Sequence, residues 1–223
     1  DRFARVYDAR FCGSEGLHRS DIGGSEAGEG RGGPVHKLCP EGFKGGRGYP
    51  QITCVDFSVQ GELVASYIDE RIYLFDVAPG AQGEVLQAYE GHANAETVKG
   101  VGFFGPQDEF VMSGSDCGHF FFWRKRGGEV QQVLKGDEAV VNVLTPHPNE
   151  PGVLATSGIE CTAKIWAPTA EGSSVPEDMN QVCERNRTRS RRPNSSELLT
   201  ALLHNIASAS GGAVPESVLE ALL

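Results

Sequence analysis

Cysteine and histidine are the residues of this chain best suited to metal binding or nucleophilic catalysis, and the chain has six of each. The cysteines are Cys12, Cys39, Cys54, Cys117, Cys161 and Cys183, and the histidines are His18, His36, His92, His119, His147 and His204. Zinc and redox motifs place two cysteines about three positions apart, and a zinc-protease helix places two histidines about four positions apart. Neither spacing occurs here. We therefore predict no metal site and no cofactor, and the wide spacing of the cysteines indicates reduced thiols.

The glycine-rich stretch from 12 to 49 is a second place to look for chemistry, because glycine-rich loops can cradle phosphate groups. It lacks the Gly-Lys-Ser or Gly-Lys-Thr ending of a phosphate-binding loop, and the chain has no Gly-x-Ser-x-Gly nucleophile elbow. The sequence therefore predicts a binding protein and not an enzyme. Such a glycine-rich composition does not offset the entropy lost on folding. We expect Gly13–Gly33 to be disordered and 34–43 to be ordered.

Three repeats with a shared pattern make up most of the chain. Each has an apolar strand, a strand of small residues, and a third strand that ends in an aromatic residue, namely Phe75, Trp123 or Trp166. Their spacing is close to the period of about 40–45 residues that is typical of four-stranded propeller blades. We expect strands at 51–58, 63–69, 71–76 and 84–91, at 97–105, 109–118, 119–125 and 129–136, and at 140–148, 152–160 and 162–168.

The repeats predict an all-β fold: a fragment of a WD40 β-propeller with about three blades of an expected seven, followed by short C-terminal α-helices. The units are expected to be the end of a truncated blade at 1–11, a glycine-rich loop at 12–49, blades at 50–91, 92–136 and 137–169, and a basic linker with C-terminal helices at 170–223. The third repeat lacks a clear outer strand after Ala167. Because the pattern is already under way at Phe3, we expect a piece of a longer protein.

The region after Pro168 is expected to contain a linker and two helices. Residues 184–192 form a basic run, which we interpret as a solvated linker, with a nuclear-import patch or an RNA contact as alternatives. Asn194 and Glu197 have the spacing of a helix N-terminal capping box, and an apolar stripe follows them. Pro215 suits the first turn of a second, shorter helix.

Charge limits the classes of partner. The formal net charge is −10 at pH 7. Nucleic acids and anionic membranes are bound by basic surfaces, so we do not expect nucleic acid to be a partner. No apolar run approaches the ~20 residues of a membrane span. These features favour a protein of the nucleus or cytoplasm that binds other proteins.

Several polar residues match the hydrogen-bond network that fixes WD40 blades. That network links a Gly-His pair, a serine or threonine, a turn aspartate and a tryptophan, because buried polar groups need partners. The second repeat supplies Gly91, His92, Ser113, Ser115, Asp116 and Trp123, the first supplies Asp69, and the third supplies Trp166. Asp116 lies one position before the usual place of the turn aspartate. We therefore expect partial networks whose role is structural.

Longer runs of sequence resemble one family more closely. Tyr7-Asp8-Ala9-Arg10 is similar to the Trp-Asp-x-Arg ending of WD proteins that dock onto cullin-4 ubiquitin ligases. Residues 97–129, which include the run SGSDCGH, and residues 140–171 resemble the C-terminal blades of the eighth cullin-4-associated factor and its plant relatives. The resemblance implies a substrate receptor that bridges the adaptor, damaged-DNA-binding protein 1, to a target for ubiquitination. It implies that Asp8 and Arg10 contact the adaptor.

The match to the docking motif is incomplete. Tyr7 replaces the usual tryptophan, and the residues after Phe75, Trp123 and Trp166 do not repeat the motif. The alternative hypothesis is a WD-repeat scaffold outside any ligase, which binds histone, RNA or other protein partners. Dependence of adaptor binding on Arg10 would favour the receptor, whereas steeply salt-dependent binding of a polyanion would favour the scaffold.

Overall fold

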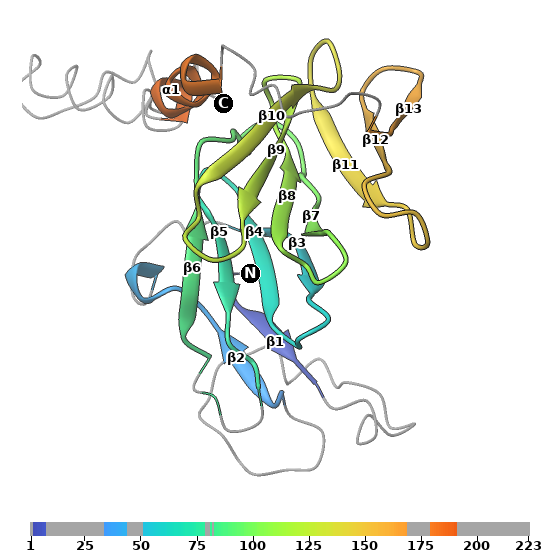
Figure 1. Cartoon of the computed structure of the whole chain (residues 1–223). Coiled ribbons are helices and arrows are strands. Elements are labelled where there is room, and N and C mark those ends of the chain that lie inside the picture. Colours follow the sequence, from blue (N-terminus) through green and yellow to red (C-terminus); the bar gives the residue numbers. More distant parts are fainter. Residues whose placement is uncertain are drawn as a thin grey trace, which may run out of the picture.

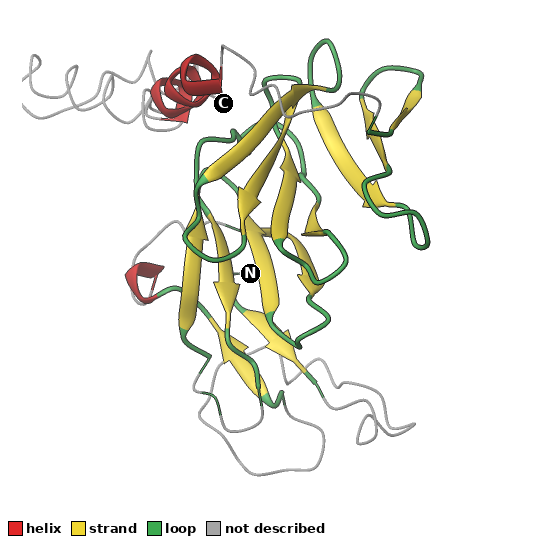
Figure 2. Ribbon diagram, in the orientation of Figure 1, coloured by secondary structure: helices red, strands yellow, loops and turns green. Residues whose placement is uncertain are grey.

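The chain is built from antiparallel β-sheets that lie side by side (Figures 1 and 2). The computed structural model describes residues 2–7, 34–43, 51–78, 81, 83–168 and 179–190. The first blade contains β3 (Ile52–Phe57), β4 (Leu63–Tyr67), β5 (Ile72–Phe75) and β6 (Val85–Tyr89). The second blade contains β7 (Val101–Phe104), β8 (Phe110–Gly114), β9 (His119–Arg124) and β10 (Val130–Lys135). In both blades the strands are hydrogen-bonded in chain order, as in a propeller blade.

The third blade has three strands within the described residues, which are β11 (Val141–Pro146), β12 (Leu154–Gly158) and β13 (Ala163–Trp166). On the far side of the first blade, β1 (Ala4–Val6) pairs with β2 (His36–Leu38), and a 3-10 turn, η3 (Glu41–Phe43), follows. The order predicted from 34 to 43 is therefore confirmed. The predicted disordered segment Gly13–Gly33 lies outside the described residues.

The middle strands of the blades alternate between two cores. Val64 of β4 faces the second blade, whereas Leu63 and Ala65 on either side of it face the β1–β2 sheet. Likewise Trp123 of β9 packs against the first blade and Phe122 packs toward the third. Because successive side chains of a strand point to opposite faces, a strand that is covered on both faces is apolar almost throughout. The all-β, propeller-type fold predicted from the repeats is thus confirmed.

One α-helix, α1 (Met179–Ser190), is described, and it replaces the solvated linker that we predicted for the start of the basic run. Val182 and Cys183 are buried in the core between the first and second blades, and Asn186 is also buried. With Met179 they form an i, i+3, i+4, i+7 face, which explains why this polar segment docks as a helix. The helices predicted to start at Asn194 and Pro215 lie outside the described residues. No described helix has the length and apolar character needed to cross a membrane.

Candidate interaction site

The residues predicted to contact the adaptor, Asp8 and Arg10, lie outside the described residues, which end just before them at Tyr7. The preceding strand β1 is held in place by its pairing with β2. It is held also by the Tyr67 hydroxyl, which donates to the carbonyl of Arg2 over 3.3 Å. The chain therefore reaches the predicted docking motif directly from a strand that packs on the first blade.

Asp116 organises the loop that precedes the second blade. Its carboxylate accepts the backbone N–H of Ala95 at 2.6 Å and that of Glu96 at 2.9 Å, and it pairs with Lys99. The side chains of Lys99 and Asp116 have no exposed area. Burial by itself raises the pKa of Asp116, but the bonds from Lys99, Glu96 and Ala95 outweigh it and lower that pKa below its usual value. The carboxylate of Asp116 is therefore engaged by two backbone N–H groups and one ammonium group of this loop.

The two serines and the tryptophan of the second blade bond mainly to backbone. Ser115 Oγ accepts the N–H of Ala93 at 2.9 Å, and Trp123 Nε1 donates to the carbonyl of Glu90 at 2.9 Å. Ser113 Oγ donates to backbone carbonyls, that of Gly100 among them at 3.0 Å. These hydrogen bonds tie the loop after β6 to the body of the second blade.

His92 differs from the expected network. Its ring is 7% exposed and stands edge-on to Trp123, with ring centroids 5.6 Å apart. Among the described residues, neither ring nitrogen has a hydrogen-bond partner. The early position of Asp116 explains the difference, because its carboxylate turns to Lys99 and two amides. Burial lowers the pKa of His92 to about 4, so the ring is neutral at pH 7.

Asn94 joins the first and second blades, although the sequence analysis did not single it out. From the loop between β6 and β7, its Nδ2 donates to Ser66 Oγ and to the carbonyl of Tyr67, each at 3.0 Å, and to Thr53 Oγ1 at 3.2 Å. The Asn94 carbonyl in turn accepts the N–H of Asp69 at 2.8 Å. Asp69 has a φ of 54° at the turn between β4 and β5, a left-handed conformation that Asp and Asn tolerate.

The third blade has a simpler version of the same pattern. Trp166 Nε1 donates to Thr156 Oγ1 at 2.9 Å, the tryptophan–threonine bond that WD40 blades use. The loop before β11 is fixed by Asp137, whose carboxylate accepts the N–H groups of Ala139 at 2.9 Å and Val140 at 3.2 Å. The sequence analysis did not single out Asp137, because this position follows Gly136 where the second repeat has His92 after Gly91. The feature that could have identified it is an aspartate just before the first strand of the third blade.

Helix α1 docks on the loop of the second blade through polar contacts. Asn186 Nδ2 donates to the carbonyl of Gly91 at 2.8 Å and to Cys117 Sγ at 3.3 Å. Burial raises the pKa of the Cys117 thiol, but hydrogen bonds from His119, Ser115 and Asn186 outweigh it and lower that pKa to about 7. The helix therefore adds one of the three side chains that polarise this thiol.

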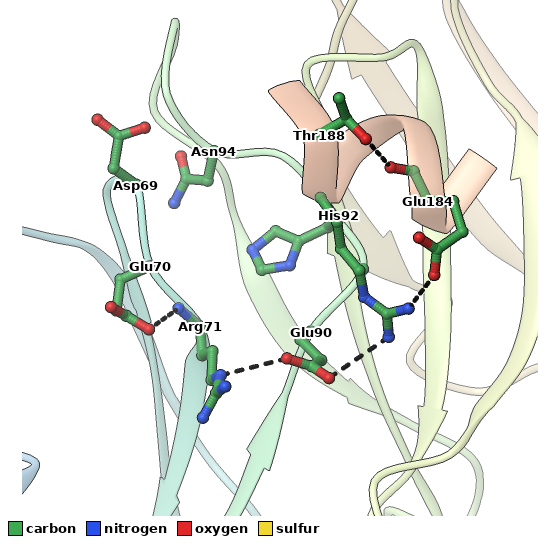
Figure 3. A pocket seen from close by; sticks show the side chains of 10 residues that line it. Asp69, Glu70, Arg71, Glu90, His92, Asn94, Glu184 and Thr188 are labelled. Atoms are coloured by element: carbon green, nitrogen blue, oxygen red, sulfur yellow. Dashed lines mark hydrogen bonds and ion pairs between the residues drawn. The ribbon is translucent and has the colours of Figure 1, made fainter. Parts of the chain in front are cut away.

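A cavity of about 720 Å³ opens between α1, the turn after β4 and the loop after β6 (Figure 3). Glu90 accepts bonds from two guanidinium groups at the wall, that of Arg71 at 3.3 Å and that of Arg187 at 3.4 Å. Arg187 also pairs with Glu184 at 2.5 Å. His92 and Asn94 line the interior. In the described part of the chain no group of three or more metal-binding side chains forms. The lining of the cavity is charged and polar.

Comparison with known proteins gives a repeat family and several relatives. Residues 83–124 match the WD domain, G-beta repeat. The chain is 35% identical over 164 residues to Protein ALTERED SEED GERMINATION 2 of Arabidopsis thaliana. The aligned region covers 69% of this chain and 21% of that protein. It is also 48% identical over 88 residues to human DDB1- and CUL4-associated factor 6. That aligned region covers 39% of this chain and 10% of that protein.

A third relative, human WD and tetratricopeptide repeats protein 1, is 40% identical over 121 residues, covering 52% of this chain and 17% of that protein. The chain thus spans at most about a fifth of the length of these relatives. The finer resemblance to the eighth cullin-4-associated factor stays a prediction. The chain contains a WD40 repeat and is homologous to WD-repeat proteins, among them a DDB1- and CUL4-associated factor.

Proposed function

We propose that this chain is part of a substrate receptor of a cullin-4 ubiquitin ligase, which bridges damaged-DNA-binding protein 1 to a target protein. The observation that carries the proposal is the 48% identity over 88 residues to DDB1- and CUL4-associated factor 6. In this role the protein performs no chemistry itself. It holds a target near the ligase, and rigid packed blades suit that task because they fix the relative positions of two binding surfaces.

The fold supports a docking role for the N-terminal segment. The motif with Asp8 and Arg10 follows β1, whose Ala4 is buried against the first blade together with Leu38 of β2. Arginine suits an adaptor contact because its planar guanidinium forms two parallel hydrogen bonds with a carboxylate. A motif that starts at a packed strand also loses less conformational entropy on binding than one on a free tail.

The test measures the affinity of the full-length protein for purified damaged-DNA-binding protein 1 by calorimetry, with and without Arg10→Ala. We expect Arg10→Ala to weaken binding about 10-fold or more, which corresponds to about 1.4 kcal/mol. Arg124→Ala is the matched control, because Arg124 is an exposed arginine on the second blade. Circular dichroism confirms that each variant is folded.

Either of two outcomes would contradict the proposal or its site. Equal, tight binding of wild type and Arg10→Ala would keep the receptor role and remove Arg10 from the interface. No binding by folded wild-type protein would reject the receptor role. A WD-repeat scaffold outside the ligase is then favoured, because WD and tetratricopeptide repeats protein 1 is also a relative.

A further inference from the structure

We propose that the cavity between α1 and the blades binds a basic side chain, lysine or arginine, presented by a partner protein. The cavity is bounded by the turn after β4, the loop after β6, and Glu184, Arg187 and Thr188 of α1 (Figure 3). This inference goes beyond recruitment to a ligase, and its test does not need the adaptor. It would identify the chemistry by which this face of the protein recognises a target.

Two buried side chains of the cavity, His92 and Asn94, have polar atoms without a hydrogen-bond partner among the described residues. Both ring nitrogens of His92 and the Oδ1 atom of Asn94 have none among the described residues, and these side chains are 7% and 3% exposed. A buried polar atom without a partner costs about 1–3 kcal/mol. The Asn94 amide cannot turn to solve this, because its Nδ2 is already bonded to Ser66 and Tyr67. A ligand that donates hydrogen bonds can satisfy Asn94 Oδ1 and the one nitrogen of the neutral His92 ring that carries no proton.

The charges of the cavity favour a cation. Its lining contains four carboxylates and two guanidinium groups, which gives a net charge of −2. Both guanidinium groups are already engaged, since Arg71 and Arg187 each pair with Glu90. His92 adds no positive charge, because burial holds its pKa at about 4. Asp69 and Glu70 also line the cavity, on the turn after β4, where Glu70 accepts the Tyr73 hydroxyl at 3.3 Å.

The shape of the site favours a side chain on a partner over a small free molecule. The helix wall is open to solvent, since the side chains of Glu184 and Arg187 are 68% and 44% exposed. Figure 3 shows the His92 ring projecting into the space between Asn94, Arg71 and Glu90. A long basic side chain can reach from the open side to His92, with its methylene groups beside the walls and its N–H donors at the interior acceptors.

The test is a nuclear magnetic resonance titration of the full chain that follows the amide of Gly91, which lines the cavity. The probes are a Gly-Ser peptide with one central arginine, the same peptide with lysine, and the same peptide with citrulline. Citrulline keeps the length and shape of arginine but carries no charge. We expect saturable shifts with the arginine and lysine peptides and at least 10-fold weaker binding of the citrulline peptide.

Two variants and a control connect binding to the cavity. His92→Phe keeps a ring against Trp123 and removes both ring nitrogens, so we expect at least 10-fold weaker binding without loss of thermal stability. Asp69→Asn with Glu70→Gln removes two charges with little change of shape, and asparagine tolerates the left-handed φ of Asp69. We expect this double variant to bind several-fold more weakly. Glu138→Gln with Glu150→Gln removes two exposed charges elsewhere and should bind as wild type.

The proposal is overturned if the citrulline peptide binds as tightly as the arginine peptide, or if the control variant loses as much affinity as the cavity variants. It is also overturned if free arginine binds as tightly as the peptide, because the cavity would then be a small-molecule site. Should His92→Phe unfold, the Asp69 and Glu70 double variant decides the question alone.

Discussion

The second and third blades follow the same sequence pattern but differ in burial. Strand β9 is buried along four of its six residues, and Trp123 has no exposed area. The equivalent strand β13 has no buried residue, and its Ile165 is 72% exposed. The second blade packs between the first and third blades, whereas the third packs on the second. In this fold the contribution of a residue to the free energy of unfolding therefore depends more on the neighbouring blades than on the position of the residue in its own repeat.

The largest expected difference is between the two closing tryptophans. Trp123→Ala should lower the free energy of unfolding by about 4 kcal/mol, because it leaves a cavity between two blades. Trp166→Ala should lower it by about 1 kcal/mol, because the partly exposed site can relax and admit water. Urea unfolding followed by circular dichroism measures both values. Equal losses would show that the third blade is as well supported as the second.

The ion pairs give the next contrast. Lys99→Met should cost about 3 kcal/mol, because it leaves the buried carboxylate of Asp116 without its charge partner. Lys164→Met removes the partner of Glu160 in the third blade, where both side chains are in contact with solvent, and should leave stability unchanged. The same urea experiment in low and high salt checks this. If salt changed the effect of Lys99→Met on stability as much as that of Lys164→Met, the burial of the pair between Lys99 and Asp116 would be contradicted.

A smaller effect should appear on acidification. The pKa of Asp116 is lower in the folded chain than its usual value of 3.8, so the unfolded chain takes up the proton first. The stabilisation is present above pH ~4 and is lost as the pH falls through the folded pKa. Asp116→Asn should therefore have a flatter stability profile below pH 4 than wild type. Urea unfolding at several pH values between 5 and 2 measures it, and parallel profiles would argue against the ionised pair.

The smallest effect is on reactivity and not on stability. Because the pKa of Cys117 is about 7, its alkylation by iodoacetamide should reach half of its maximal rate near pH 7. Asn186→Ala removes the hydrogen bond from α1 and should move this midpoint to higher pH. Mass spectrometry of the peptide that contains Cys117 provides the rates. An unchanged midpoint would mean that α1 does not rest on this loop in solution.

The sequence predicted the blades well and the loops less well. Apolar alternation and the closing aromatics located all eleven blade strands, because strand periodicity and burial are local properties. Strand β7 nevertheless begins at Val101 instead of residue 97, because the side chains of Thr97 and Lys99 both bond to Asp116 in the preceding loop. Such a loop depends on contacts between distant residues, which a repeat pattern does not encode.

The candidate site shows the same division. The sequence identified His92 and Asp116 as network residues, but it could not show that Lys99 takes the carboxylate and leaves the imidazole without a partner. It also missed α1, since the charged residues of the basic run masked the narrow face formed by Val182, Cys183 and Asn186. The cavity forms where α1 lies beside the loop that contains His92 and the turn after β4.

The match of residues 83–124 to a single WD repeat has an evolutionary consequence. This segment contains β6, the outer strand of the first blade, together with the three inner strands of the second blade. A tandem duplication of such a genetic unit would place a new outer strand after each set of inner strands, so every added blade would be complete. Ancestral propellers could therefore change their number of blades in single steps without leaving an unfinished sheet inside the array.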